Sequence, residues 1–215
     1  MAKEPWVKGF TTNPTLMRKA GITDYEAFAK DILSQINGLP ISFEVFSDDL
    51  DDMRRQALLI ASWSADVYVK IPVTNTQGID TSPLVRSLVD DGVKLNVTAL
   101  MTEKQVESVG SALGAEVPSI ISVFAGRIAD TGRDPVAIMT RSLELIAGNT
   151  NIELLWASPR EILNLVQADE IGCHIITMTN DLLAKVPSLG KDLDEFSLDT
   201  VRMFHADASS AGFAI

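Results

Sequence analysis

The sequence has few of the residues that disulfide bonds and metal sites require. Its single cysteine, Cys173, excludes a disulfide bond within the chain and a cysteine-rich metal site. The two histidines, His174 and His205, form neither an H-x-H nor an H-E-x-x-H pattern. We interpret His174 as a core residue and His205 as a surface residue. We therefore expect no metal site and no cofactor.

Signatures of several other protein classes are also missing. There is no G-x-G-x-x-G turn, so a dinucleotide-binding fold has no support, and the lack of a G-x-S-x-G turn removes the hydrolase interpretation. The 18 basic residues are outnumbered by 29 acidic ones, and the net charge of −11 argues against nucleic-acid and anionic-membrane partners. An anionic ligand would have to be held by a few local cations.

Long apolar stretches are scarce too. The N-terminal segment M-A-K-E-P-W-V-K-G-F lacks the apolar centre of a signal peptide, and no stretch reaches membrane-spanning length. We therefore expect a cytoplasmic protein without a membrane partner.

What the sequence does contain is a regular alternation of strand-like and helix-like segments. The predicted strands begin near Val7, Ile41, Val67, Val93, Ser119, Ile152 and His174. Alternation of this kind implies parallel pairing through right-handed crossovers. No linker or low-complexity segment interrupts the pattern. We therefore predict a single domain over residues 1–215, with a final helix at about residues 196–211.

Two architectures compete for this strand count, a TIM (βα)8-type barrel and an open doubly wound sheet. The barrel needs one strand more, and typically about 250 residues, and the shortfall lies at the N-terminus. Polar residues nevertheless fall at or near the carboxyl ends of nearly all the strands. They are Thr12, Asn13, Glu44, Lys70, Asn96, Thr98, Ser122, Arg127, Ser158 and Arg160. An open sheet would use only the two strands at its switch point, so we predict an α/β barrel of the TIM (βα)8 type whose first strand is missing.

Lys70 lies in the middle of the apolar segment V-Y-V-K-I-P-V-T, residues 67–74. Lysines are almost never fully buried without a reason, and a desolvated lysine can act as a neutral amine that attacks a carbonyl group to form a Schiff base. The alternative is a lysine at a strand end that extends to solvent. Glu44, within S-F-E-V-F on the neighbouring strand, is the obvious partner of Lys70. That partnership could equally be a structural ion pair.

The other polar residues have structural alternatives when each is taken singly. Asn13 precedes Pro14 and could be a turn former. Asn96 could form hydrogen bonds inside a barrel without a ligand. Thr98 and Ser122 belong to residue types that occur in many strands.

Two arginines in tight loops are typical of a phosphate site. Arg127 follows Gly126, and Arg160 shares the turn A-S-P-R with Ser158. Small neighbours allow a phosphate to approach the forked guanidinium group closely. A surface salt bridge is the alternative for each arginine.

With these residues in place, the sequence resembles the transaldolase family, including the related fructose-6-phosphate aldolases. The resemblance rests on G-F-T-T-N-P-T at residues 9–15, V-K-I-P-V-T at 69–74, L-N-V-T at 95–98 and S-V-F-A-G-R-I at 122–128. It implies a βα barrel, a class I aldol mechanism without metal, and sugar phosphate substrates. It also implies a homo-oligomer, for which the tail after Phe196 is a plausible contact.

The resemblance assigns a catalytic role to three residues. Lys70 matches the lysine that forms the Schiff base. Glu44 matches a carboxylate that works through a water molecule, and Thr98 matches the hydroxyl group that holds that water.

It assigns substrate binding to others. Asn13 and Asn96 match residues that bind the hydroxyl groups of the donor and position the intermediate. Ser122 matches a hydroxyl group near the bound dihydroxyacetone unit, and Arg127 matches a phosphate-binding arginine.

The position of the second half of the phosphate site depends on the alignment. Matching A-S-P-R to the A-S-F-R of the family makes Ser158 and Arg160 phosphate ligands. An ungapped alignment through the following helix would instead place Leu155 and Ala157 there. We prefer the first match, because an acidic protein that binds a sugar phosphate needs local cations.

Three positions bear on the reaction. The aldolase branch usually has glutamine where Glu44 stands and tyrosine where Phe124 stands, so both residues favour a transaldolase. The family's first strand carries an acid/base aspartate, and that strand is absent, so either the chain starts late or an unusual substitute closes the gap. We therefore expect weakened catalysis, and turnover as fast as that of a complete transaldolase would contradict this expectation.

The predicted function is transfer of a dihydroxyacetone unit from a ketose phosphate to an aldose phosphate in the pentose phosphate pathway. One alternative is a fructose-6-phosphate aldolase that releases free dihydroxyacetone. The other is a non-catalytic barrel that binds sugar phosphates.

Overall fold

The computed structural model describes residues 4–36 and 38–213. Its strands are β1 (Phe10–Thr11), β2 (Ile41–Glu44), β3 (Val67–Pro72), β4 (Leu95–Leu100), β5 (Ser119–Val123), β6 (Ile152–Trp156) and β7 (Ile175–Ile176). All neighbouring pairs are parallel, and the order in the sheet follows the order in the chain. The predicted strands are thus confirmed, although β1 begins at Phe10 and β4 at Leu95.

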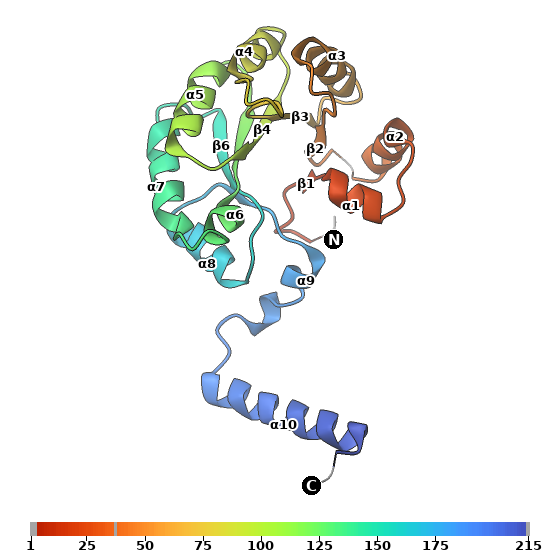
Figure 1. Ribbon diagram of the computed structural model, residues 1–215, viewed down its shortest axis with the longest axis vertical. Coiled ribbons are helices and arrows are strands. Elements are labelled where there is room, and N and C mark those ends of the chain that lie inside the picture. The colour runs from red at the N-terminus through yellow and green to blue at the C-terminus, as the bar shows by residue number, and fades with distance from the viewer. Residues whose placement is uncertain (1–3, 37, 214–215) are drawn as a thin grey trace. The chain divides into compact units, whose positions relative to one another are not determined.

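Helices connect the strands and cover the outer face of the curled sheet (Figure 1). They are α1 (Pro14–Lys19), α2 (Tyr25–Gln35), α3 (Leu50–Ala61), α4 (Ser82–Asp90), α5 (Glu103–Leu113), α6 (Ala125–Ala129), α7 (Pro135–Ile146) and α8 (Leu163–Glu170). The sheet of the described residues has β1 and β7 as its two edges. The predicted fold class, a TIM-type α/β barrel that lacks one strand, is confirmed.

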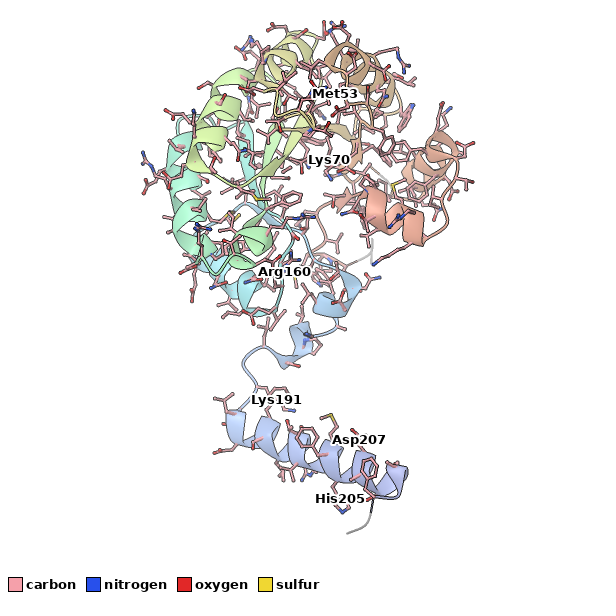
Figure 2. The ribbon with its side chains drawn as sticks, in the orientation of Figure 1. Met53, Lys70, Arg160, Lys191, His205 and Asp207 are labelled. Atoms are coloured by element: carbon pink, nitrogen blue, oxygen red, sulfur yellow. The ribbon has the colours of Figure 1, made fainter. Side chains whose placement is uncertain are left out.

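The core lies between the sheet and the helices, because successive residues of a strand point to opposite faces. In β3, Val69 and Ile71 are fully buried and belong to the apolar cluster that includes the helices. Lys70 lies between them and points to the other face, which is the interior of the curled sheet (Figure 2). A smaller apolar cluster, centred on Ile120 and Leu155, occupies part of that interior.

The described chain divides into two compact units, one ending at Thr177 and one beginning at Met178. The second contains α9 (Asn180–Leu183), a 3-10 turn η1 (Val186–Ser188) and α10 (Leu193–Ala211). The prediction of a single domain over residues 1–215 stays a prediction.

Helix α10 begins at Leu193, earlier than the expected residue 196, because the side chain of Asp192 accepts the Asp194 and Glu195 N–H groups and caps the helix there. It ends at Ala211 as predicted, before Gly212 in the left-handed conformation. The helix buries none of its side chains, and Phe204 is 62% exposed. The prediction of a homo-oligomer with a contact in this tail stays a prediction. Among the described helices, none combines the length and the apolar character that crossing a membrane requires.

Candidate active site

Lys70 is buried in the interior of the sheet and forms an ion pair there. Its Nζ donates to Glu44 Oε1 at 2.5 Å and to the carbonyl oxygen of Thr12 at 3.0 Å. The Lys70 side chain is 9% exposed and that of Glu44 15% exposed. Lys70 therefore does not extend to solvent. Strand pairing explains the contact, because Glu44 of β2 lies in register with Lys70 of β3.

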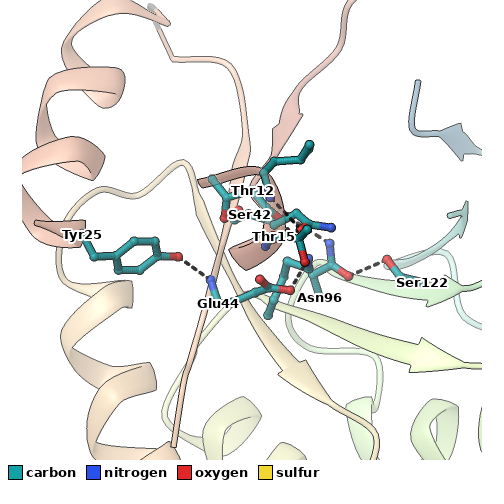
Figure 3. A network of polar contacts seen from close by, with 10 residues as sticks. Thr12, Thr15, Tyr25, Ser42, Glu44, Asn96 and Ser122 are labelled. Atoms are coloured by element: carbon teal, nitrogen blue, oxygen red, sulfur yellow. Dashed lines mark hydrogen bonds and ion pairs between the residues drawn. The ribbon is translucent and has the colours of Figure 1, made fainter. Parts of the chain in front are cut away.

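Beside this pair, a chain of side-chain hydrogen bonds crosses the interior (Figure 3). Asn96 of β4 is in register with Lys70 and is fully buried. Its Nδ2 donates to Ser42 Oγ at 3.0 Å, and its Oδ1 accepts from Ser122 Oγ at 2.7 Å. Side chains from β2, β4 and β5 thus form a polar layer on the interior face of the sheet, where Lys70 also lies.

Ser42 is a member of this layer that the sequence alone did not single out. It lies two residues before Glu44 on β2, so the two side chains point to the same face. That spacing was the signal that could have identified it. Ser42 is 3% exposed, and its hydroxyl group holds the amide of Asn96 in place.

Two polar atoms in this interior are buried without a hydrogen-bond partner among residues 4–36 and 38–213. They are Glu44 Oε2 and Thr98 Oγ1. Thr98 lies on β4, two residues beyond Asn96, and is 7% exposed. A buried polar atom without a partner costs about 1–3 kcal/mol, so such atoms are rare unless a ligand or water serves them. Both residues therefore fit a site that receives polar groups.

Asn13 lies at the end of β1 but acts as the N-cap of α1. Its Oδ1 accepts the N–H groups of Thr15 at 2.8 Å and Leu16 at 3.2 Å. The interpretation of Asn13 as a turn former is therefore correct for its amide oxygen. Hydrogen bonds do not join Asn13 to Lys70 within the described chain, and its substrate-binding role stays a prediction.

Arg160 lies in the turn after β6 and is held by two neighbours. Its Nε donates to Asp130 Oδ1 at 2.9 Å, its Nη2 donates to Asp130 Oδ2, and its Nη1 donates to Ser158 Oγ at 3.1 Å. The hydrogen bond from Arg160 lowers the pKa of the Asp130 carboxyl group. The salt bridge that the sequence left open for Arg160 is thus formed.

Arg127, on α6 after β5, is exposed, and its guanidinium group lies 5.5 Å from the centre of the Phe124 ring. Its charge also contributes to the lowered pKa of Asp130, so both arginines act on one carboxylate. Leu155 and Ala157 are buried in the smaller apolar cluster and carry no polar side-chain atom. They are poor candidates for a phosphate site beside Ser158 and Arg160.

Gly126 allows α6, which carries Arg127, to lie close to the turn that carries Ser158 and Arg160. A Cβ atom at Gly126 would lie 1.6 Å from the carbonyl oxygen of Ser158. Ser158 itself has a left-handed backbone with φ of 61°, which is uncommon for a residue with a side chain. The turn at residues 157–160 is therefore held in one position against α6, as a site with a defined geometry requires.

The interpretation of His174 as a core residue is wrong, because the residue is exposed beside the short edge strand β7. Its Nδ1 accepts the N–H group of Leu154 at 3.0 Å. His205 on α10 is exposed, as expected. Cys173 is half-buried, and burial raises the pKa of its thiol group.

Comparison with known proteins gives matches to one family. The family model described as Transaldolase/Fructose-6-phosphate aldolase matches residues 1–215. A probable transaldolase 2 of Listeria monocytogenes is 36% identical over 198 residues, which cover 90% of this chain and 86% of that protein. A probable transaldolase of Desulforamulus reducens is 31% identical over 201 residues, which cover 92% and 88%.

A solved structure supports the fold alone. A mandelate oxidase mutant with an FMN adduct superimposes with a TM-score of 0.50 at 10% sequence identity. The match covers 69% of this chain and 52% of the other, so it spans about half of the length of that protein. The family is shown instead by the family model, which matches the full sequence, and by the two relatives. The protein belongs to the transaldolase/fructose-6-phosphate aldolase family.

Proposed function

We propose that the protein is a transaldolase in which Lys70 carries the dihydroxyacetone unit as a Schiff base. The observation that carries this proposal is the buried Lys70–Glu44 pair, which faces the polar layer inside the barrel. A buried ion pair is weak evidence for stability, since two apolar residues often serve as well. A catalytic role explains the buried pair, because one of its members is then the lysine that attacks a carbonyl group.

The reaction begins when the neutral Lys70 amine attacks the ketone carbon of the donor. Loss of water then gives an imine, and its protonated form accepts electrons when the bond between the third and fourth carbons breaks. A base takes the proton of the hydroxyl group on the fourth carbon, and an aldose phosphate leaves. The remaining three-carbon enamine adds to a second aldose phosphate, and hydrolysis of the new imine frees Lys70.

Glu44 governs the charge of Lys70 in this scheme. At 2.5 Å from Nζ, Oε1 can accept the proton that the ammonium must lose before it attacks. The second oxygen, Oε2, and the Thr98 hydroxyl group are two of the four buried side-chain polar atoms without partners among the described residues. They support the relay through a water molecule that the family resemblance implies, in which Thr98 holds the water against Glu44.

The substrate-binding residues form two sets, one assigned to the hydroxyl groups of the donor and the other to its phosphate group. Asn96 and Ser122 present polar atoms beside Lys70 and are assigned to the hydroxyl groups of the donor, together with Asn13. Arg127, Arg160 and Ser158 are assigned to the phosphate group. In a chain with a net charge of −11, these arginines supply the local positive charge that a sugar phosphate needs.

Glu44 and Phe124 favour transfer over simple cleavage, because the aldolase branch usually has glutamine and tyrosine there. The two reactions differ in their need for an acceptor. We expect fructose 6-phosphate alone to give no continuing turnover, and addition of erythrose 4-phosphate to start formation of sedoheptulose 7-phosphate and glyceraldehyde 3-phosphate. Chromatography of the products checks this. Steady release of free dihydroxyacetone without an acceptor would instead identify an aldolase.

The Thr98 hydroxyl group offers a test that separates function from stability. Thr98→Val removes a buried hydroxyl that has no partner within the described residues, so we expect no loss of melting temperature. Turnover should fall by about 10²-fold, as for loss of a proton-transfer step. Thr81→Val is the matched control, because Thr81 Oγ1 donates to the Pro72 carbonyl oxygen at 2.6 Å. It should cost about 1 kcal/mol of stability and leave turnover unchanged. Unchanged turnover in Thr98→Val would remove Thr98 from the relay.

A further inference from the structure

The hydrogen bonds between β1 and β2 stop one step before the catalytic carboxylate. Phe10 N donates to the Pro40 carbonyl oxygen at 2.8 Å, and Thr12 N donates to that of Ser42 at 3.0 Å. In a parallel pair, a residue that donates its N–H group to the partner strand accepts, at its carbonyl oxygen, the N–H group that lies two residues further along that same strand. The regular continuation would therefore join the Glu44 N–H group to the carbonyl oxygen of Thr12.

Both of these groups have other partners. Glu44 N donates to the hydroxyl oxygen of Tyr25 at 2.8 Å (Figure 3). The Thr12 carbonyl oxygen accepts from Lys70 Nζ at 3.0 Å. One sheet hydrogen bond has thus been exchanged for two others, and one of them holds the lysine.

Tyr25 is fixed in the position that makes this exchange possible. It is the first residue of α2, whose N-terminus is capped by Asp24. Its ring packs edge-to-face against Phe46 at 4.6 Å and against Phe43 and Trp63, each at 5.9 Å between centres. Burial raises the pKa of its hydroxyl group, so the group stays neutral and can accept the Glu44 N–H group.

We propose that Tyr25 is a positioning residue for the Schiff-base lysine. By accepting the N–H group of Glu44, it leaves the Thr12 carbonyl oxygen free to hold the Lys70 ammonium group. This inference rests on the proposed function of Lys70 but concerns a residue outside the family motifs on which that function was assigned.

Loss of the Tyr25 hydroxyl group would change the partners of Lys70. A carbonyl oxygen that accepts from an ammonium group favours its charged form. Without the Tyr25 hydroxyl, the Glu44 N–H group takes the Thr12 carbonyl oxygen, and Lys70 keeps only Glu44 as a partner. The ammonium form of Lys70 then has one stabilising partner fewer than in the wild-type protein.

The groups around Lys70 limit what else could produce such a change. Glu44 of β2 contacts Lys70 directly. Tyr25 of α2 contacts Glu44 and acts on Lys70 only through it. Strands β4 and β5 present only neutral side chains to it in the described hydrogen bonds, those of Asn96 and Ser122. Tyr68 lies on the same face of β3 as Lys70, and its hydroxyl group is not bonded to Glu44.

The test compares Tyr25→Phe with Tyr68→Phe, since the chain has two tyrosines. Both changes remove a hydroxyl group and keep the ring. Each protein is treated with formaldehyde and cyanoborohydride over a range of pH, and peptide mass mapping measures methylation of Lys70. We expect the pH of half-maximal methylation to fall by about one unit in Tyr25→Phe and to stay unchanged in Tyr68→Phe.

Two outcomes would overturn the proposal. One is an unchanged midpoint in a Tyr25→Phe protein with native circular dichroism and melting behaviour. The other is an equal shift in both variants, which would indicate a general loosening of the interior. The formaldehyde reaction needs no sugar, so it tests Tyr25 even if the proposed function fails. A wild-type protein whose Lys70 is methylated but forms no adduct with a ketose phosphate would contradict the function alone.

Discussion

Replacement of Lys70 by methionine is expected to lower turnover by about 10⁴-fold or more, because the amine forms the covalent bond on which every later step depends. Methionine has a similar length and fills the space with apolar atoms. Among the described residues, no second lysine is bonded to Glu44 that could replace Lys70. Product formation measured over hours, with purified protein, checks the loss.

The same change should also destabilise the fold, and this effect must be separated from catalysis. Lys70→Met leaves the Glu44 carboxylate buried without its cation, which costs about 3–5 kcal/mol. Adding Glu44→Gln removes the buried charge and should restore most of the stability without restoring turnover.

The matched control for the lysine itself is Lys94→Met, because Lys94, just before β4, donates from Nζ to the Ala65 carbonyl oxygen and lies over the Tyr68 ring. We expect that variant to remain active. Substantial turnover by the folded Lys70→Met/Glu44→Gln protein would contradict the role of Lys70.

Gly126→Ala is expected to raise the KM for a ketose phosphate by about tenfold or more. The new Cβ atom would lie 1.6 Å from the Ser158 carbonyl oxygen, so the turn that carries Ser158 and Arg160 must move away from α6. Overpacking of this kind costs about 1–3 kcal/mol of stability in well-packed regions. The displaced turn separates Arg160 from Arg127 and weakens the phosphate site that we assign to them.

Two comparisons make this result specific. Gly148→Ala is the control, because nothing lies within 4 Å of a Cβ atom added there. Steady-state kinetics with fructose 6-phosphate and with unphosphorylated fructose then separate binding of the phosphate from the chemistry on Lys70. An equal loss for both sugars in Gly126→Ala would show that the turn does not form the phosphate site.

Much of the polar interior could be predicted from the sequence, because it depends on simple periodicity. Glu44 and Lys70 occupy neighbouring predicted strands, and parallel pairing brings such residues side by side. Asn96 and Thr98 lie two residues apart in one strand and therefore face the same side. The barrel and most of its polar layer follow from these local patterns.

Residues whose role depends on packing between distant elements could not be predicted. From the sequence, Tyr25 is predicted to occupy an ordinary apolar position of a helix. Only the placement of α2 against the end of β2 brings its hydroxyl group to Glu44. Asp130 follows the arginine motif by only a few residues, yet its bond to Arg160 depends on the turn after β6. The exposed character of His174 likewise follows from the shortness of β7 at the sheet edge.

Covalent trapping tests the central claim most directly. The full-length protein is incubated with fructose 6-phosphate, reduced with borohydride and digested, and the peptides are mapped by mass. We expect one three-carbon or six-carbon adduct, located on Lys70 and absent from the Lys70→Met protein. Lack of any adduct, or an adduct on another lysine, would contradict the account and leave a barrel that only binds sugar phosphates.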